Sequence, residues 1–127
     1  PAMRKAKKGA IVNISSIHAR MSYPNYFPYA AAKSAILGLT RRLAREVGAD
    51  KIRVNAIAPG LFLTGRLQGM FDALAESERN EVLNAIPLKR MPEIDECVQP
   101  VLFLASDAAS YMTGTVLDVN GGRLMPS

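Results

Sequence analysis

Three apolar runs stand out along the chain, at positions 9–16, 51–60 and 115–119. Each is flanked by glycine, proline, serine or asparagine, which is typical of strands that end at turns. The first run, "GAIVNISS", is continuous rather than alternating, and this indicates a strand covered on both faces of a parallel sheet. The sequence therefore predicts about three strands, of which the first is buried.

Between the first two runs, apolar residues return with the helical period of about 3.6 residues. A helix over residues 29–47 is predicted, ended by Gly48. Strand, helix and strand with short links form a βαβ unit, which favours parallel pairing and a right-handed crossover. The predicted apolar stripe of the helix consists of Ile36, Leu39, Leu43 and Val47.

Lys33 falls with Tyr29 on or beside this stripe, whereas the helix's three arginines fall on the opposite side. A lysine on a buried side loses hydration unless a partner compensates it, so Lys33 is a functional candidate. A snorkelling side chain is the alternative. Small residues cluster on the face away from the apolar stripe, and we favour a subunit interface there over simple exposure. These small residues are Ala31, Ser34, Ala35 and Gly38.

The rest of the chain has weaker periodicity. We expect a loop and one or two short helices around residues 72–85, and a further helix over residues 94–106. Pro100 falls inside that second helix, and because proline lacks a backbone donor we expect a late start or a kink.

Composition narrows the class of protein. The chain has 127 residues, is 49% hydrophobic and carries a net charge of +5, with a basic cluster at residues 3–8. That cluster lacks interleaved aromatic residues, so we expect no nucleic-acid partner. Cys97 is the sole cysteine, which suits a reducing, cytoplasmic setting. No apolar run reaches the roughly 18 residues of a membrane span. We expect neither a membrane partner nor a metal site.

Tyr29 and Lys33 are spaced i, i+4, which brings their side chains within reach on a helix. Tyrosine acts as a general acid or base only if its pKa falls from about 10 toward neutrality, and a nearby ammonium has that effect. Ser16 ends the first predicted strand, and Pro59 and Gly60 end the second. Ligands of open α/β sheets bind outside such carboxyl ends, so these residues predict one site.

These features occur together with several longer motifs. They are "IVNISS", thirteen residues from Ser16 to Tyr29, "YAAAK", "IRVNAIAPG" and "FLASDAASYMTGTVLDVNGG". In this order they closely resemble the short-chain dehydrogenase/reductase family, over nearly the whole chain. The resemblance implies an NAD- or NADP-dependent oxidoreductase that interconverts a small secondary alcohol and a ketone.

The resemblance also implies roles for the site residues. Tyr29 would exchange a proton with the substrate oxygen, and Ser16 would hydrogen-bond that oxygen. Lys33 would lower the pKa of Tyr29 and bind the cofactor ribose. The stretch "PGLFLT" would meet the nicotinamide end of the cofactor, with a phenylalanine where the family usually has a smaller aliphatic residue. Its contacting residues would be Pro59, Gly60, Phe62 and Thr64.

Family members are usually about twice this length. Residues 1–127 resemble only the carboxyl-terminal half of one Rossmann-like, doubly wound parallel domain, with residues 1–9 as the tail of a preceding helix. No glycine-rich dinucleotide turn occurs here, and the chain begins with proline, so we expect a fragment. Asn13 does not match the family's catalytic asparagine. Alone, the chain should be unstable, aggregated or oligomeric.

Two interpretations of function remain open. The first is an enzyme that forms a homo-oligomer, dimer or tetramer. The second is a truncated, inactive module that associates with full-length subunits. In the substrate pocket, His18 is either a candidate contact to the substrate or a surface histidine. We expect Arg20, Tyr23 and Tyr26 in the substrate pocket or on the rim of that pocket. Met70 and Phe71 are candidates for an apolar lid. These residues do not separate a sugar from a keto-acid ester or a 3-oxoacyl thioester.

Overall fold

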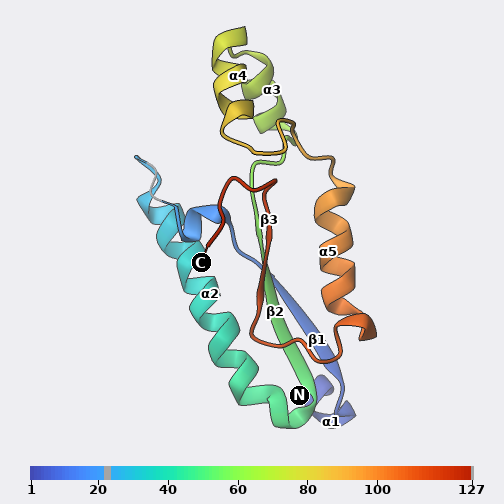
Figure 1. Cartoon of the computed structure of the whole chain (residues 1–127). Coiled ribbons are helices and arrows are strands. Elements are labelled where there is room, and N and C mark those ends of the chain that lie inside the picture. Colours follow the sequence, from blue (N-terminus) through green and yellow to red (C-terminus); the bar gives the residue numbers. More distant parts are fainter. Residues whose placement is uncertain (22–23, 127) are drawn as a thin grey trace.

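The computed structural model describes residues 1–21 and 24–126. A three-stranded sheet lies between two long helices, with the short helices at its two ends (Figure 1). In chain order the main elements are α1 (Ala2–Ala6), β1 (Gly9–Ile14), α2 (Phe27–Val47), β2 (Ile52–Pro59), α3 (Arg66–Asp72), α4 (Glu76–Asn84), α5 (Asp95–Ala105) and β3 (Val116–Val119). Single 3-10 turns follow β1, α2 and α5: η1 (Ile17–Ala19), η2 (Gly48–Asp50) and η3 (Asp107–Ala109).

The sheet is parallel throughout, in the order β1-β2-β3. Gly9 pairs with Ile52 and Ile14 with Ile57, so β1 and β2 run in register along their length. The predicted parallel α/β sheet of three strands is confirmed. The prediction of a buried first strand is wrong: among the residues that the structure describes, β1 pairs with β2 alone, most of the strand is half-buried, and Ile14 at its end is 47% exposed. The buried strand is β2, in the centre.

Helices cover both faces of this sheet. Helix α2 packs on one face, chiefly over β2, and α5 packs on the other face against all three strands (Figure 1). One buried cluster joins α2 to β2 through Ala44, Val47 and Val54, and another joins α5 to β2 through Leu104 and Ile57. The helices α3 and α4 lie beyond the carboxyl ends of the strands, and α1 lies at the opposite end (Figure 1).

The buried stripe of α2 differs from the predicted one. It runs through Leu37, Thr40, Ala44 and Val47, whereas Leu39 is 55% exposed. A threonine stands at its centre: the Thr40 hydroxyl donates to the Ile36 carbonyl at 2.8 Å and accepts from Asn13 Nδ2 at 2.9 Å. Because this polar residue is buried with its hydrogen bonds satisfied, a stripe drawn from apolar residues alone misses the true face.

Two further boundaries differ from expectation. The two short helices after β2 are both present, but the first, α3, begins at Arg66 rather than near residue 72. Helix α5 begins at Asp95 and continues past Pro100, so the predicted late start is wrong. The apolar face of α5 packs on β2. At the end of the helix, Arg53 donates hydrogen bonds to the carbonyl oxygens of Leu104 and Ser106. These contacts outweigh the loss of the backbone donor at Pro100.

Candidate active site

The end of β1 places two serines beneath the start of α2. Ser15 and Ser16 are buried, and the Ser15 hydroxyl donates to the Lys33 carbonyl at 2.9 Å. The Ser16 hydroxyl oxygen accepts from the His18 amide at 3.2 Å and so caps η1. Since that bond uses a lone pair of the oxygen, the Ser16 hydroxyl proton remains available for a ligand.

Lys33 lies one turn before Leu37 on the buried stripe of α2 and is half-buried. Its Nζ atom donates to the Ile14 carbonyl at 3.0 Å and lies 5.6 Å from the centre of the Tyr29 ring. The compensation that a buried lysine requires therefore comes from the end of β1. The same contact holds the ammonium beside Tyr29, as the i, i+4 spacing predicts.

A cleft of about 700 Å³ opens at the carboxyl ends of β1 and β2. It brings together Ser16 and His18 after β1, Tyr29 of α2, and the stretch that follows β2. The predicted residues from that stretch all line it: Pro59, Gly60, Phe62 and Thr64. Lys33 does not line the cleft, and its Nζ atom lies beside the Tyr29 ring. Ser16 and Tyr29 thus line one cleft, and Lys33 lies beside Tyr29.

His18 lies between two tyrosines in this cleft. Its ring centre is 5.8 Å from that of Tyr29, edge to face, and 5.4 Å from that of Tyr26. Burial lowers the pKa of His18, and the positive charge of Arg123 lowers it further. At pH 7 the imidazole is therefore neutral and presents one donor and one acceptor rather than a charge.

The other expected pocket residues divide between the cleft and its surroundings. Tyr26 lines the cleft, whereas Arg20 forms an ion pair with Asp118 of β3. Tyr23 lies outside the described residues. The predicted lid residues, Met70 and Phe71, do not line the cleft: Met70 is 52% exposed, and Leu67 of the same helix lines the cleft instead.

Several lining residues were not anticipated from the sequence. Helix α5 contributes Cys97 and Val98, its N-cap residue Ile94 lies beside them, and Arg123 comes from the segment after β3. Burial raises the pKa of the Cys97 thiol, which keeps it protonated. The i, i+3, i+4 spacing of Ile94, Cys97 and Val98 was a usable signal, but only tertiary packing turns that face toward Tyr29.

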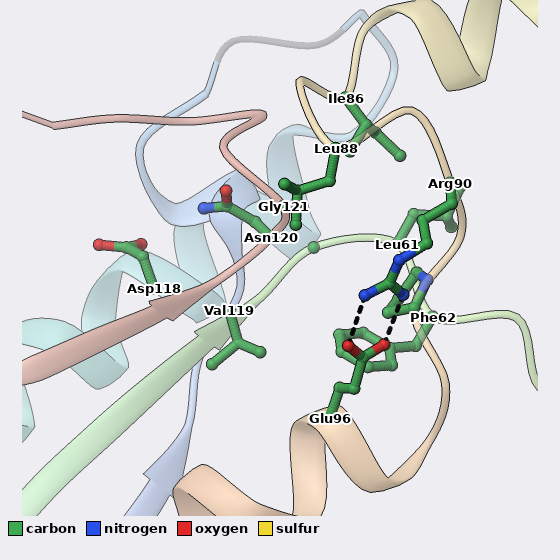
Figure 2. A pocket seen from close by; sticks show the side chains of 12 residues that line it. Leu61, Phe62, Ile86, Leu88, Arg90, Glu96, Asp118, Val119, Asn120 and Gly121 are labelled. Atoms are coloured by element: carbon green, nitrogen blue, oxygen red, sulfur yellow. Dashed lines mark hydrogen bonds and ion pairs between the residues drawn. The ribbon is translucent and has the colours of Figure 1, made fainter.

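A second, smaller cavity of about 240 Å³ lies next to the cleft, between the ends of β2 and β3 and the segment that leads into α5 (Figure 2). Arg90 and Glu96 wall it with two hydrogen bonds of 2.7 and 2.6 Å. The Arg90 bond, together with a bond from the Glu93 amide, lowers the pKa of Glu96 to about 2. This pair fixes the start of α5, which also carries cleft residues.

Gly60 separates the two cavities and lines both. Its amide donates to the Val119 carbonyl at 2.8 Å, and a Cβ atom placed on it would stand 2.9 Å from the Asn120 Cβ. Glycine is therefore required by close backbone packing against the turn after β3.

Two absences can be stated for residues 1–21 and 24–126. No helix there combines the length and the apolarity needed to cross a bilayer. No group of three or more histidine, cysteine or acidic side chains is placed there to hold a metal ion.

A parallel sheet with helices on both faces and a cleft at the carboxyl ends of its strands is the arrangement of nucleotide-binding α/β proteins. A family model described as Enoyl-(Acyl carrier protein) reductase matches residues 1–123. The chain belongs to the short-chain dehydrogenase/reductase family, which uses NAD or NADP.

Relatives in sequence and in structure agree with this assignment. The chain is 48% identical over 120 residues to a 3-oxoacyl-[acyl-carrier-protein] reductase of Chlamydia muridarum, covering 94% of this chain and 47% of that protein. The crystal structure of levodione reductase is 38% identical with a TM-score of 0.86, covering 95% and 48% of the two chains. A gluconate 5-dehydrogenase from Burkholderia cenocepacia, in complex with NADP and tartrate, is 30% identical with a TM-score of 0.88, covering 96% and 47%.

The chain thus spans about half the length of the relatives that it matches. That share agrees with the expectation of a partial chain.

Proposed function

We propose that this chain carries the catalytic half of an NAD(P)-dependent oxidoreductase that interconverts a secondary alcohol and a ketone. One observation carries the proposal: Ser16 and Tyr29 line a single cleft, while Lys33 is held beside Tyr29 by the Ile14 carbonyl. The relatives' names support the reaction class, since they include reductases of a 3-oxoacyl group and of levodione, and a gluconate dehydrogenase.

Each residue of this group has a distinct task. On reduction of a ketone, the Tyr29 hydroxyl donates a proton to the substrate oxygen, and on oxidation the phenolate takes the alcohol proton. The Ser16 hydroxyl donates to the same oxygen, since its proton is not engaged by the bond that it accepts from the His18 amide. The Lys33 ammonium favours the phenolate form by its charge.

The cleft-lining residues at and after the end of β2 suit the nicotinamide end of the cofactor. Gly60 brings bare backbone to the cleft and Thr64 offers a hydroxyl, while Phe62 supplies an apolar wall. We assign Pro59, Gly60, Phe62, Thr64 and Lys33 to holding that end. The bound cofactor supplies or accepts the hydride. Nothing in these residues selects NAD over NADP.

The test is a change of Tyr29 to phenylalanine in the complete polypeptide that contains this chain. General acid–base catalysis typically contributes about 10²–10⁴-fold, so Tyr29→Phe should lower kcat by that range. Tyr111→Phe is the matched control, because Tyr111 is fully exposed at the opposite end of the sheet. Activity of Tyr29→Phe within a factor of two of the unmodified enzyme would refute the assignment.

A truncated module is the second candidate function. The exposed end of β1 favours it, since Ile14 leaves both an apolar side chain and an unpaired strand edge open to a partner. In that case the chain would associate with full-length subunits. Isolation of the 13.7 kDa chain from its natural source together with a longer homologous subunit would favour this candidate over the enzyme.

A further inference from the structure

The single turn η1 begins at the Ser16 hydroxyl. Ser16 is the N-cap residue of this turn, and its hydroxyl oxygen accepts a hydrogen bond from the His18 amide at 3.2 Å. The next amides of the turn are also bonded. Ala19 donates to the Ser16 carbonyl at 3.0 Å, and Arg20 donates to the Ile17 carbonyl at 2.9 Å. The direction of the Ser16 hydroxyl therefore depends on where η1 is held.

Side chains from two other elements bind the far end of this turn. The Ser34 hydroxyl of α2 donates to the Ala19 carbonyl at 2.8 Å. The Arg20 guanidinium forms an ion pair with the Asp118 carboxylate of β3. Because β2 lies between β1, which leads into η1, and β3, this ion pair joins segments that are not neighbours in the sheet. Turn η1 is thus bound to α2 through one contact and to β3 through the other.

The position of Asp118 on β3 suits it to this contact. Leu117 packs with the buried cluster beneath α5, and because side chains alternate along a strand, Asp118 points to the opposite face of the sheet. Figure 2 shows the Asp118 side chain directed away from the Arg90–Glu96 pair. The side chains of Arg20 and Asp118 are only 27% and 23% exposed. Since water and salt screen such a pair less than a surface pair, it can hold η1 firmly.

We infer that Arg20 and Asp118 are positioning residues, which fix η1 so that the Ser16 hydroxyl points at the substrate oxygen. This inference rests on the proposed function, in which Ser16 donates to that oxygen, and adds two residues to it. Neither Arg20 nor Asp118 lines the cleft, so both act through Ser16. A donor that is held in place before the reaction does not have to be ordered in the transition state.

A double-mutant cycle on kcat/KM tests this role in the complete polypeptide. Arg20→Gln removes the charge and should lower kcat/KM by about 5- to 50-fold. Ser16→Ala removes the positioned hydroxyl and should lower kcat/KM by about 10²–10³-fold. In the Ser16→Ala background, Arg20→Gln should have an effect of less than about twofold, because the group that it positions is gone. Equal losses from Arg20→Gln in both backgrounds would overturn the inference.

Variants of the partner residue and of an unrelated ion pair complete the design. Asp118→Asn, alone or combined with Arg20→Gln, should show the same loss as Arg20→Gln, since each change breaks the one pair. Arg20→Lys keeps the positive charge and should recover part of the activity. Arg42→Gln is the matched control, because it breaks an exposed ion pair with Glu46 and should change kcat/KM by less than about twofold. A loss for Arg42→Gln as large as that for Arg20→Gln would contradict the inference.

Hydrogen exchange gives a readout that does not depend on turnover. The amides of residues 18–21 are all hydrogen-bonded, so Arg20→Gln should raise their exchange rates by about 10-fold or more, and Arg42→Gln should leave them unchanged. Unchanged exchange of these amides in Arg20→Gln would overturn the inference. If Tyr29→Phe retains full turnover while Arg20→Gln still raises the exchange rates, the proposed function fails and the anchoring of η1 by Arg20 stands.

Discussion

The ammonium of Lys33 donates a hydrogen bond to the Ile14 carbonyl across 3.0 Å, and this bond ties the start of α2 to the end of β1. The Ser15 hydroxyl forms a second tie between the same segments by donating to the Lys33 carbonyl. Lys33 thus has two roles: it fixes the position of Tyr29 relative to Ser16, and it places a positive charge 5.6 Å from the Tyr29 ring centre.

Replacing Lys33 by methionine should show how much its charge and its hydrogen bond contribute beyond the packing of its side chain. Methionine retains the length of the side chain but removes the charge and the bond to Ile14, so kcat should fall by about 10²-fold or more. The complete protein should also lose about 1 kcal/mol of unfolding free energy. Steady-state assays and urea unfolding measure the two effects. Lys5→Met, on the exposed helix α1, should change neither, and unchanged activity of Lys33→Met would contradict its role.

The buried Asn13–Thr40 pair should contribute to stability rather than to catalysis. Thr40→Val keeps the shape of the side chain but leaves Asn13 Nδ2 without its acceptor, which should destabilise the protein by about 1–3 kcal/mol. Denaturant unfolding of Thr40→Val, Asn13→Ala and the double variant forms a cycle. A coupling energy near zero would show that the two side chains do not depend on each other.

The Arg90–Glu96 pair should make stability depend on pH in the acid range. The pKa of Glu96 is about 2, below the reference value of 4.5, so Glu96 stays ionised in the folded protein at pH values where it takes up a proton in the unfolded chain. The contribution of the pair is complete above pH 4.5 and is lost as the pH falls toward 2. Urea midpoints of the unmodified protein and Glu96→Gln should converge over that interval. Parallel curves from pH 6 to pH 2 would rule the effect out.

Replacing Gly60 and Gly38 by alanine should change the stability of the protein in opposite directions. Gly60→Ala places a Cβ atom 2.9 Å from the Asn120 Cβ and 3.0 Å from its Cα, and should cost about 1–3 kcal/mol. Gly38→Ala lies on the exposed small-residue face of α2 with no atom within 4 Å, and should stabilise the helix by about 0.5–1 kcal/mol. Thermal unfolding of both variants gives the comparison. If Gly38→Ala instead lowers the oligomeric mass of the complete protein, the predicted subunit interface lies on this face.

The isolated chain should associate or aggregate through β1. An unpaired edge that ends in the exposed Ile14 offers both backbone hydrogen bonds and apolar surface. Sedimentation analysis at rising concentration should show species larger than the 13.7 kDa monomer. Ile14→Lys should reduce this association. A sharp two-state unfolding transition of a monomer at low concentration would contradict the prediction.

Much of the fold could be predicted because its signals are local. The apolar runs, the glycines and the prolines mark β1, β2 and β3 to within two residues, and the i, i+4 spacing identifies Tyr29 and Lys33. Ser16 was a candidate from its place at the end of the first predicted strand, and resemblance to a known family then gave it a role, since a serine at a strand end is otherwise an ordinary turn residue. These features depend on residues that are close in sequence, where side-chain periodicity is the controlling factor.

Tertiary structure alone decided what depends on contacts between distant segments. The exposure of β1 follows from having one neighbouring strand, and the true buried face of α2 follows from the bond between Thr40 and Asn13. In the same way, Arg123 reaches the Ser16 cleft only because the turn after β3 is folded around Asn120. No periodicity encodes such contacts, because each joins side chains whose separation in space is set by packing of the whole sheet and its helices.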